Sequence, residues 1–558
     1  MSLMIRDLDR LTARTFDVLV VGGGIYGLTI AYDAAQRGLS VALVERDDFG
    51  SGSSFNHLRT IHGGLRYLQT LDISRARESI GERRTTARIA PQTVRPLPFA
   101  VPLYRSLMRG KMAMRAGFTL DRLISADRNA GVLASHRLPG GRVVSRSDAI
   151  QRFPGLRRQR LTGAAVFHDY VTLEPDRFTF SFALAADAHG AVLANHVEAI
   201  APLVDGRRVT GVRARDTLGT RTLEIAARLT VNATGGRVDA LLKPLDIATG
   251  IPMLKAMNLV TTRDAGEEAL GGRSSSGRNL FLVPWRDRAL FGTWESDRTC
   301  DPDDTSVSER EVAAFIAELN QAFPALDLTM ADVTLVHRGV VPAAVRGGRV
   351  GLAGHEQIRD HATDGVDGLL TVAGTKFTTA RRVAQRVTDT VLFKLHHTPV
   401  PCRTATTPLP GGDLGDIGLA IADARREFDR GLPTDTIPHL IAAYGSRYRD
   451  VMEIAADRPD LRTRLAPHSP VIGAQLVLAA RKEMAPTLAD TVIRRTPLGA
   501  LGHPGDAAVA RAASIVGGEL GWSEDRRQEE IAAVRAFYRG PVTSPRRDDD
   551  SAREGIAG

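Results

Sequence analysis

The chain has 558 residues, of which 43% are hydrophobic and 25% charged. This length and balance predict a soluble-type globular protein of two to three domains with a large core. No apolar run reaches the ~18 residues that a membrane-spanning helix needs, and the polar N-terminal sequence is not a signal peptide. The two cysteines, Cys300 and Cys402, are isolated and lack metal-ligand spacing. We therefore expect reduced thiols, no metal site and a cytoplasmic location.

The formal net charge is +9 and the sequence pI is about 9.8. A basic balance is compatible with nucleic acid, an anionic membrane surface or an anionic substrate as partner. Arginine greatly outnumbers lysine, as is typical of a GC-rich coding sequence, which weakens the charge as a functional argument. No nucleic-acid-binding motif occurs, so we expect no nucleic-acid partner.

Residues 16–47 combine, in order, a strand, a glycine turn, a helix, a second strand and an acidic residue. The first apolar strand is Val18–Val21, and the second, Val41–Val44, ends in the acid. A glycine motif alone is weak evidence, but here every part of a βαβ unit is in place. The stretch predicts a dinucleotide-binding site.

Each glycine of this turn has a different structural role. Gly22 permits the tight turn, Gly24 lets the backbone approach a pyrophosphate, and Gly27 lets the helix pack closely on the strand. The phosphates would then lie against the N–H groups and the positive dipole end of the helix. Glu45 stands where an acidic side chain accepts hydrogen bonds from an adenosine ribose.

The motif does not choose between FAD and NAD, but three features favour FAD. The unit opens the chain, as it often does in FAD folds. Arg228–Gly236 predicts a strand that returns beside the first unit and ends in a glycine turn. Gly368–Arg381 predicts a further strand, a turn and a helix start near Thr378, whose dipole would face the anionic edge of a reduced flavin. Each feature taken singly also fits an ordinary strand and turn.

The rest of the pattern predicts an α/β fold: a Rossmann-like FAD-binding domain, an inserted antiparallel-sheet substrate domain and a C-terminal α-helical domain. Strands such as Asn279–Trp285 suit the antiparallel sheet, and the Pro/Gly-rich stretch 404–416 marks a linker before continuous helical periodicity. The expected segments are 1–80, 161–240 and 346–403 for the FAD-binding domain, 81–160 as helical, 241–345 as the substrate domain, 404–540 as the helical domain and 541–558 as a disordered tail.

The stretch Tyr104–Ile124 mixes Leu, Met and Phe with five basic residues. This composition is typical of a basic amphipathic segment on a membrane surface, and equally of a packed helix with a solvated basic face. Both interpretations stay open.

A second group of residues identifies a family. The stretch 61–68, IHGGLRYL, places two glycines before an Arg-Tyr pair. Here the chain resembles the FAD-dependent glycerol-3-phosphate dehydrogenases, within the glycine/D-amino-acid-oxidase-like flavoproteins, over most of its length. The further shared motifs are NATG at 232–235, VPW at 283–285, Arg359-Asp360, GTKFTT at 374–379 and LPGG at 409–412.

The resemblance implies both a cofactor site and a substrate site. The FAD-binding residues that it implies are Gly22, Gly24, Gly27, Glu45, Ser53, Ser54, Val197, Gly374 and Thr378. For an anionic substrate it implies a pocket with Arg66, Tyr67, Arg359 and Lys376, because a phosphate suits Arg forks and a Lys. His62 is the nearest candidate for the base, with a structural hydrogen bond under the flavin as the alternative.

The implied reaction oxidises sn-glycerol 3-phosphate to dihydroxyacetone phosphate by hydride transfer to flavin N5. The resemblance further implies that electrons pass to a quinone, that the protein lies peripherally on the inner face of the cytoplasmic membrane, and that it forms a homodimer.

Two departures from the family pattern leave the substrate open. Where the family reads GVRP, with a substrate-binding Arg, this chain has Val341, and Arg338 lies on the opposite side of an extended strand. Where the family has a histidine, this chain has Asn258, which cannot act as a base. The alternatives are therefore FAD-dependent oxidation of a different anionic hydroxy or amino substrate, or a flavin-binding scaffold without activity.

Overall fold

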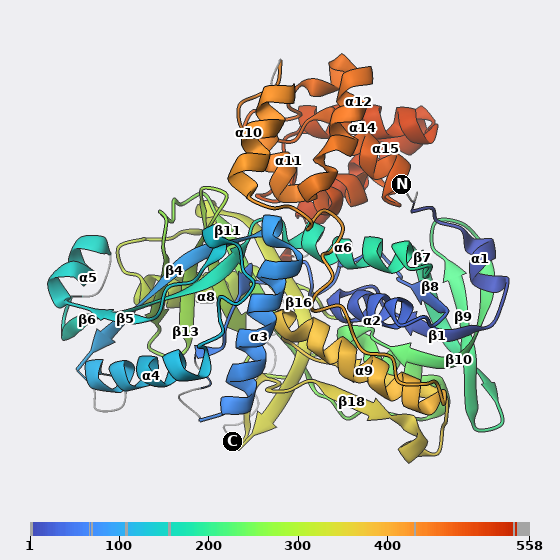
Figure 1. Cartoon of the computed structure of the whole chain (residues 1–558), viewed down its shortest axis with the longest axis horizontal. Coiled ribbons are helices and arrows are strands. Elements are labelled where there is room, and N and C mark those ends of the chain that lie inside the picture. Colours follow the sequence, from blue (N-terminus) through green and yellow to red (C-terminus); the bar gives the residue numbers. More distant parts are fainter. Residues whose placement is uncertain are drawn as a thin grey trace, which may run out of the picture.

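The computed structural model describes residues 4–65, 67, 71–105, 110–153, 158–428, 431–539 and 542–543. Two β-sheets lie beside each other, and the helices of the C-terminal part of the chain form a layer above them (Figure 1). This arrangement agrees with the predicted α/β fold with a C-terminal helical domain. Arg66 lies outside the described residues.

The first sheet has a parallel core. Its strand order is β18-β19-β10-β1-β2-β7, and the hairpin β8–β9 extends it by pairing with β10. The strands are β1 (Phe16–Val21), β2 (Val41–Val44), β7 (Val192–Ala194), β8 (Val197–Asp205), β9 (Arg208–Asp216), β10 (Thr222–Asn232), β18 (Gln357–Asp360) and β19 (Leu369–Ala373). β10 pairs in parallel with β1 and with β19, which confirms that Arg228–Gly236 returns beside the first unit.

Apolar residues cover both faces of this sheet. Val18 and Val20 of β1 pack in one cluster with α2 (Ile25–Gln36), α6 (Pro175–Ala188) and α9 (Ala380–Lys394). Leu19 and Val21 pack in another cluster with α1 (Leu8–Thr12) and the β8–β9 hairpin. Because neighbouring residues of a strand point to opposite faces, a strand buried on both sides is an unbroken apolar run.

The second sheet is mainly antiparallel. Its strand order is β17-β16-β11-β14-β13-β12-β4-β6-β3, with β5 added on β6. The strands are β3 (Thr60–Ile61), β4 (Val94–Tyr104), β5 (Arg142–Val144), β6 (Leu161–Thr172), β11 (Met253–Thr261), β12 (Ala269–Arg273), β13 (Asn279–Trp285), β14 (Arg288–Glu295), β16 (Val333–Arg346) and β17 (Arg349–Leu352). The helix α8 (Glu309–Ala322) packs its apolar side, including Phe315 and Leu319, against this sheet.

The expectation that residues 81–160 are helical is wrong in part. The helices α3 (Ile73–Ile89), α4 (Lys111–Ile124) and α5 (Arg146–Arg152) are present, but β4 lies between them and pairs along its length with β6. The second sheet therefore takes strands that were expected in the helical segment and in the FAD-binding domain. Prolines at 96, 98 and 102 argue against a strand in the sequence. They occupy alternate positions, so their missing N–H groups share one edge of β4.

The C-terminal layer consists of helices around two apolar clusters. They are α10 (Ile417–Phe428), α11 (Thr436–Tyr444), α12 (Tyr448–Asp457), α13 (Gly473–Lys482), α14 (Asp506–Leu520) and α15 (Glu524–Arg539), with a π-helical turn at Asp490–Arg495. After α15, the short strand β20 (Val542–Thr543) pairs with β15 (Val307–Ser308). The expected disordered tail is wrong for these two residues, and the rest of it lies outside the described residues.

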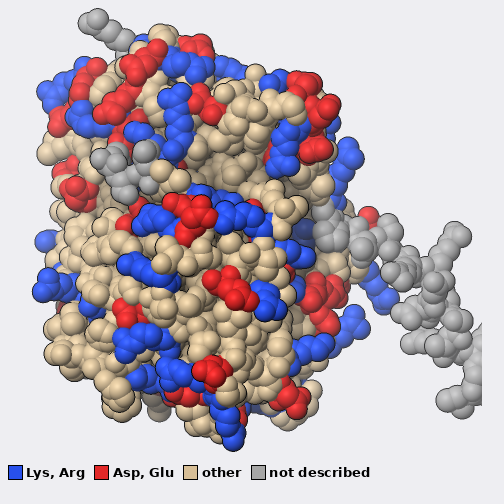
Figure 2. All heavy atoms as spheres, turned by 90° about the vertical axis from the view of Figure 1, so that its right-hand side faces the viewer, with Lys and Arg blue, Asp and Glu red and all other residues tan. Residues whose placement is uncertain are grey.

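Charged side chains of both signs are interspersed on the face shown in Figure 2. The positive net charge is not gathered into one block on this face. Within the described residues, no helix is both long and apolar enough to cross a membrane.

Candidate functional site

The first glycine turn is built by close backbone packing. Gly22 has a φ of +104°, and a Cβ there would lie 2.6 Å from the Ala233 carbonyl oxygen. A Cβ on Gly27 would lie 1.8 Å from the Gly22 carbonyl oxygen. Side chains at 22 and 27 would therefore force the strand and helix apart. The packing brings the start of α2 to the carboxyl end of β1, where its first N–H groups are available to a phosphate.

A serine loop completes the start of α2. Gly24 is the N-cap and has no side chain, so no side chain of its own caps the helix. Instead, Ser54 Oγ accepts a hydrogen bond from the Ile25 N–H at 2.9 Å. Ser53 Oγ donates to the Val340 carbonyl at 3.3 Å. The predicted pair Ser53-Ser54 therefore joins the glycine turn to β16 of the second sheet.

Glu45 lies at the end of β2, beside the glycine turn. Its carboxylate accepts hydrogen bonds from the N–H groups of Gly23 (2.6 Å) and Asp47 (2.9 Å). Burial raises the pKa of Glu45, against the effect of these two bonds. The Val197 N–H donates to the Glu45 carbonyl at 2.7 Å. The structure thus brings Glu45, Val197 and the glycine turn together, and their assignment to the ribose and adenine end of a dinucleotide stays a prediction.

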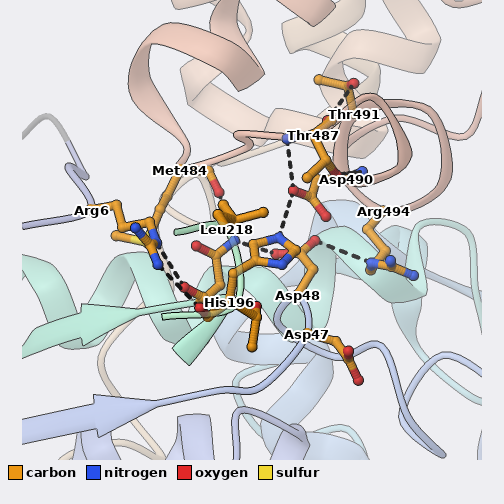
Figure 3. Close-up of polar contacts among 12 residues, drawn as sticks. Arg6, Asp47, Asp48, His196, Leu218, Met484, Thr487, Asp490, Thr491 and Arg494 are labelled. Carbon is orange, nitrogen blue, oxygen red and sulfur yellow. Dashed lines mark hydrogen bonds and ion pairs between the residues drawn. The ribbon is translucent and has the colours of Figure 1, made fainter. Parts of the chain in front are cut away.

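The loop after Glu45 is clamped by the C-terminal layer. The buried Asp48 carboxylate pairs with Arg495 at 2.6 Å, and Arg494 donates to it at 3.2 Å. Burial raises the pKa of Asp48, but the arginines lower it more, to about 2. Figure 3 shows His196 pointing at Asp490, to which its Nε2 lies at 3.0 Å, and Asp48 pointing at Arg494. The helical layer therefore fixes a loop that leads into the Ser loop.

The second glycine turn lies against the first turn of α2. β19 ends at Ala373, and a Cβ on Gly374 would lie 2.5 Å from the Tyr26 hydroxyl oxygen. Tyr26 donates from this hydroxyl to the Lys376 carbonyl at 3.3 Å. Thr378 Oγ1 accepts from the His62 N–H at 3.4 Å. The segments 61–65 and 374–379, far apart in the sequence, therefore meet beside the first glycine turn.

Lys376 lies at the centre of this junction. Its Nζ donates to Ser79 Oγ on α3 and lies 4.6 Å from the centroid of the Tyr67 ring. Burial lowers the pKa of Lys376; Tyr67 opposes this shift and Arg75 adds to it. The structure thus brings together the predicted pair Lys376 and Tyr67, and adds Ser79 and Arg75 to it.

The predicted residues His62 and Arg359 differ in their placement. The His62 ring lies 6.5 Å from the Tyr67 ring, measured between centroids. Arg359 on β18 forms an ion pair with Asp364, and its guanidinium also donates to the carbonyls of Ala248 and Thr249. His62 therefore belongs to the Lys376 junction, whereas the contacts of Arg359 form a separate group.

The structure settles whether Arg338 replaces an arginine at position 341. β16 pairs with β11 in unbroken register here, with Arg338 opposite Met257 and Val341 opposite Leu254. The strand does not turn between the two, so their side chains stay on opposite faces. Arg338 does not reach the side of the sheet that Val341 faces.

Asn258 and Arg59 are engaged in local packing. The Asn258 amide donates to the Asn56 carbonyl at 3.2 Å and accepts from Thr293 at 3.0 Å. Arg59 is completely buried, with its guanidinium 4.9 Å from the Trp285 ring centroid. These side chains therefore stabilise the loop before the IHGG stretch.

His57, which the sequence did not single out, presents an unsatisfied donor. Its Nδ1 accepts from the Arg59 N–H at 3.1 Å, and its ring stacks on Phe377 with centroids 4.3 Å apart. Burial, with Arg59 nearby, holds the pKa of His57 well below its usual value, so the ring is neutral and carries its hydrogen on Nε2. That atom is buried and has no hydrogen-bond partner within the described residues.

These observations fit a bound FAD. The glycine turn, whose packing tolerates no side chain at 22 or 27, leaves helix N–H groups for the pyrophosphate, and Glu45 lies at the ribose end. At the other end, the buried His57 N–H beside Phe377 lacks an acceptor, which a flavin heteroatom or a substrate oxygen would supply.

Comparison with known sequences agrees with this arrangement. Residues 17–390 match the FAD dependent oxidoreductase family, and residues 402–527 match the C-terminal domain of alpha-glycerophosphate oxidase. The first match alone spans more than half of the chain. The chain therefore belongs to the FAD dependent oxidoreductases, the class that the two glycine turns and the inserted sheet define.

Relatives that match nearly the whole chain identify the family within this class. A glycerol-3-phosphate dehydrogenase of Synechocystis sp. is 31% identical, covering 95% of this chain and 98% of the relative. The mitochondrial glycerol-3-phosphate dehydrogenase of Mus musculus is 33% identical, covering 94% and 73%. The solved structure of glycerol-3-phosphate dehydrogenase from Bacillus halodurans complexed with FAD has a TM-score of 0.74 at 25% identity, covering 97% and 98%. The chain is a member of the glycerol-3-phosphate dehydrogenase family, as its motifs predicted.

Proposed function

We propose that the protein oxidises sn-glycerol 3-phosphate to dihydroxyacetone phosphate with FAD as its cofactor. The observation that carries the proposal is the junction of Lys376, Tyr67 and Ser79 beside two glycine turns that contact each other through Tyr26. Family membership and the FAD-bound relative support the same assignment.

The cofactor would be held mainly by backbone. Bound FAD supplies a two-electron acceptor for a hydride from the substrate carbon. The first glycine turn would hold its pyrophosphate, with Glu45 on the ribose and the second turn at the flavin end. The residues in these roles are Gly22, Gly24, Gly27, Glu45, Ser53, Ser54, Val197, Gly374 and Thr378.

The substrate would be held by side chains. Lys376 would donate to the reacting oxygen, and its lowered pKa reflects the partly dry surroundings in which such a bond is strong. Tyr67 would orient the same oxygen, and His62 is the nearest group that could take its proton. Arg66 and Arg359 would hold the phosphate, which for Arg359 means exchanging the Asp364 carboxylate for the substrate.

Anaerobic addition of glycerol 3-phosphate to the FAD-loaded protein tests the proposal. We expect the flavin absorbance near 450 nm to bleach in the parent protein and to persist with glycerol, which has no phosphate to bind. No bleaching at millimolar glycerol 3-phosphate would contradict the proposed reaction.

One observation favours a second candidate, oxidation of another anionic hydroxy or amino compound. Val341 is apolar where the family places a substrate-binding arginine, and Arg338 lies on the other face of β16. A panel of hydroxy acids, polyol phosphates and amino acids, assayed with an artificial acceptor and for peroxide, separates the candidates. A strong preference for glycerol 3-phosphate eliminates the second.

A quinone as electron acceptor and a peripheral membrane position belong to the same proposal. The side of α4 that carries Arg115 and Arg122 also exposes Met112 (75%) and Leu123 (72%). A helix with basic and apolar exposed residues suits an anionic membrane surface. Flotation with anionic vesicles tests this, with Met112→Ser/Leu123→Ser expected to reduce binding. The proposal also includes a homodimer, which sedimentation of the purified protein tests.

A further inference from the structure

Two cations contact one aromatic ring at the substrate side of the site. The Arg75 guanidinium carbon lies 4.3 Å from the centroid of Tyr67, and Lys376 Nζ lies 4.6 Å from it. The charge of Arg75 also contributes to the lowered pKa of Lys376, so the two positive charges repel each other, and an anion that binds near both would stabilise them. The arrangement therefore favours an anionic ligand.

The carboxylates near Arg75 are already engaged. Within the described part of the chain, none lies within the 4.0 Å of an ion pair with Arg75. Glu78 pairs with Arg386 at 2.8 Å, and Asp72 accepts from the backbone N–H of Arg75. Three other arginines of α3 do have carboxylate partners: Arg77 and Arg84 pair with Asp127, and Arg83 pairs with Asp169. Arg75 thus keeps its charge for a ligand.

The contact with Tyr67 leaves the guanidinium able to bind a phosphate. A guanidinium over an aromatic ring keeps its planar fork of N–H groups, which can bind two phosphate oxygens. Because α3 is anchored at Ser79, which accepts from Lys376, Arg75 and Lys376 are held in a fixed relation. Together they would offer a guanidinium to the phosphate of the substrate and an ammonium to its reacting oxygen.

A short segment connects Arg75 with the position of Val341. The Ala353 N–H donates to the Pro342 carbonyl at 3.0 Å, and Thr375 Oγ1 donates to the Ala353 carbonyl at 3.1 Å. A Cβ on the next residue, Gly354, would lie 3.5 Å from Arg75 Nη1. Residues 353–354 therefore contact the strand residue after Val341, the residue before Lys376, and Arg75.

We propose that Arg75 binds the phosphate of the substrate and replaces, from helix α3, the arginine that Val341 does not supply. This assignment rests on the proposed function, because it names a phosphate ligand of the same site. It explains how the pocket keeps its cationic character with an apolar residue at position 341.

Steady-state kinetics of Arg75→Leu and Arg75→Lys test the assignment. A lost guanidinium removes one or two charge-assisted hydrogen bonds to phosphate, so we expect KM for glycerol 3-phosphate to rise about 10- to 100-fold in Arg75→Leu. Arg75→Lys keeps the charge without the fork and should show an intermediate rise. kcat should change less than about threefold, because the reacting oxygen contacts Lys376. The matched control is Arg77→Leu on the same helix, whose KM should stay near that of the parent protein.

Two further readouts separate a ligand from a structural role. Inorganic phosphate should protect the parent protein against thermal unfolding and inhibit it competitively, and both effects should weaken at least tenfold in Arg75→Leu. FAD content should be equal in both. The double variant Arg75→Leu/Val341→Arg should recover at least part of the lost affinity.

These measurements distinguish a failure of the Arg75 proposal from a failure of the proposed function. If the parent protein is bleached by glycerol 3-phosphate and Arg75→Leu keeps its KM and phosphate inhibition within twofold, the inference on Arg75 is wrong and the proposed function stands. If the parent is not bleached, the proposed function fails, and the phosphate measurements still decide whether Arg75 binds an anion.

Discussion

The proposed cofactor half and the proposed substrate half of the site are built in different ways. The cofactor half consists of glycine turns whose backbone atoms nearly touch, as at Gly22 and Gly27. The substrate half consists of side chains from separate segments, with Lys376 on Ser79 and Arg75 over Tyr67. A backbone-built site tolerates almost no change at its glycines, whereas a side-chain site can move a charge from one element to another. On the proposed assignment, Arg75 of α3 supplies the charge that Val341 lacks, whereas no other residue can replace the glycines of the GxGxxG turn.

Gly27→Val should have the largest effect on FAD binding and stability, because it disrupts the half of the site that is built from backbone. A Cβ at this position would lie 1.8 Å from the Gly22 carbonyl oxygen, so α2 must move away from β1. We expect loss of bound FAD and a fall in thermal stability. The flavin-to-protein absorbance ratio and a melting curve measure both.

Gly117→Ala provides the control for this change. A Cβ on Gly117, within α4, meets nothing within 4 Å, so we expect unchanged FAD content and stability equal or higher by about 0.5–1 kcal/mol. A Gly27→Val protein with full FAD content would show that the close packing at the turn is dispensable.

Asp48→Asn tests whether the loop after Glu45 depends on the helical layer. Asp48 and Arg495 have completely buried side chains, and removing one partner of such a pair typically lowers the free energy of unfolding by about 3–5 kcal/mol. Chemical denaturation of the FAD-loaded protein measures it.

The matched exposed pair is Glu427 with Arg449, in which both side chains are about half exposed. Glu427→Gln should leave the free energy of unfolding nearly unchanged, because water and salt screen an exposed pair. Equal effects of Asp48→Asn and Glu427→Gln on the free energy of unfolding would contradict this difference between a buried and an exposed pair.

The Asp48 pair also depends on pH. Because the pKa of Asp48 is depressed to about 2, the contribution of Asp48 to the free energy of unfolding is present above the unfolded pKa near 3.9 and is lost as the pH falls through about 2.

Lys376→Met should damage the substrate half and spare the cofactor half. Losing one donor to the reacting oxygen typically lowers kcat by about 10²–10³-fold. FAD content should be unchanged, because Lys376 meets Tyr26 only through its backbone carbonyl. Stopped-flow bleaching of flavin measures the rate, and Lys243→Met, at an exposed position, serves as control. A bleaching rate within threefold of the parent would remove Lys376 from the proposed role.

The smallest expected effect is a pH dependence at His196, where the helical layer meets the cofactor half. Burial lowers its pKa, but the hydrogen bond and charge of Asp490 raise it more. A raised pKa means that the contribution is fully present below the unfolded value of about 6.5 and is lost as the pH rises through the folded value. Melting temperatures from pH 6 to 9 should fall more in the parent than in His196→Asn, whereas His397→Asn, at an exposed position, should behave as the parent does.

Sequence patterns predicted the parts of the molecule that local rules determine. The unit β1-α2-β2, the strand Asn279–Trp285 and the returning strand at Arg228–Gly236 are confirmed. Val18–Val21 and Val41–Val44 are unbroken apolar runs, and the returning strand ends in a glycine turn. β4 was missed because its prolines argue against a strand unless the neighbouring strands are known. Arg75 could not be distinguished from Arg77 or Arg83 in the sequence, since only the tertiary contacts show that the latter two pair with carboxylates.

The helical layer contacts both sheets, and this limits how the molecule can open. It holds the cofactor sheet through Asp48 and Arg495, and it packs on the second sheet where Ala500 and Leu501 join the cluster around Trp285. A hinge between the sheets would have to break a buried ion pair or expose that cluster. The helical layer thus holds the two sheets in a fixed relation to each other. Entry of substrate and exit of product therefore depend on loops and side chains at the opening of the site.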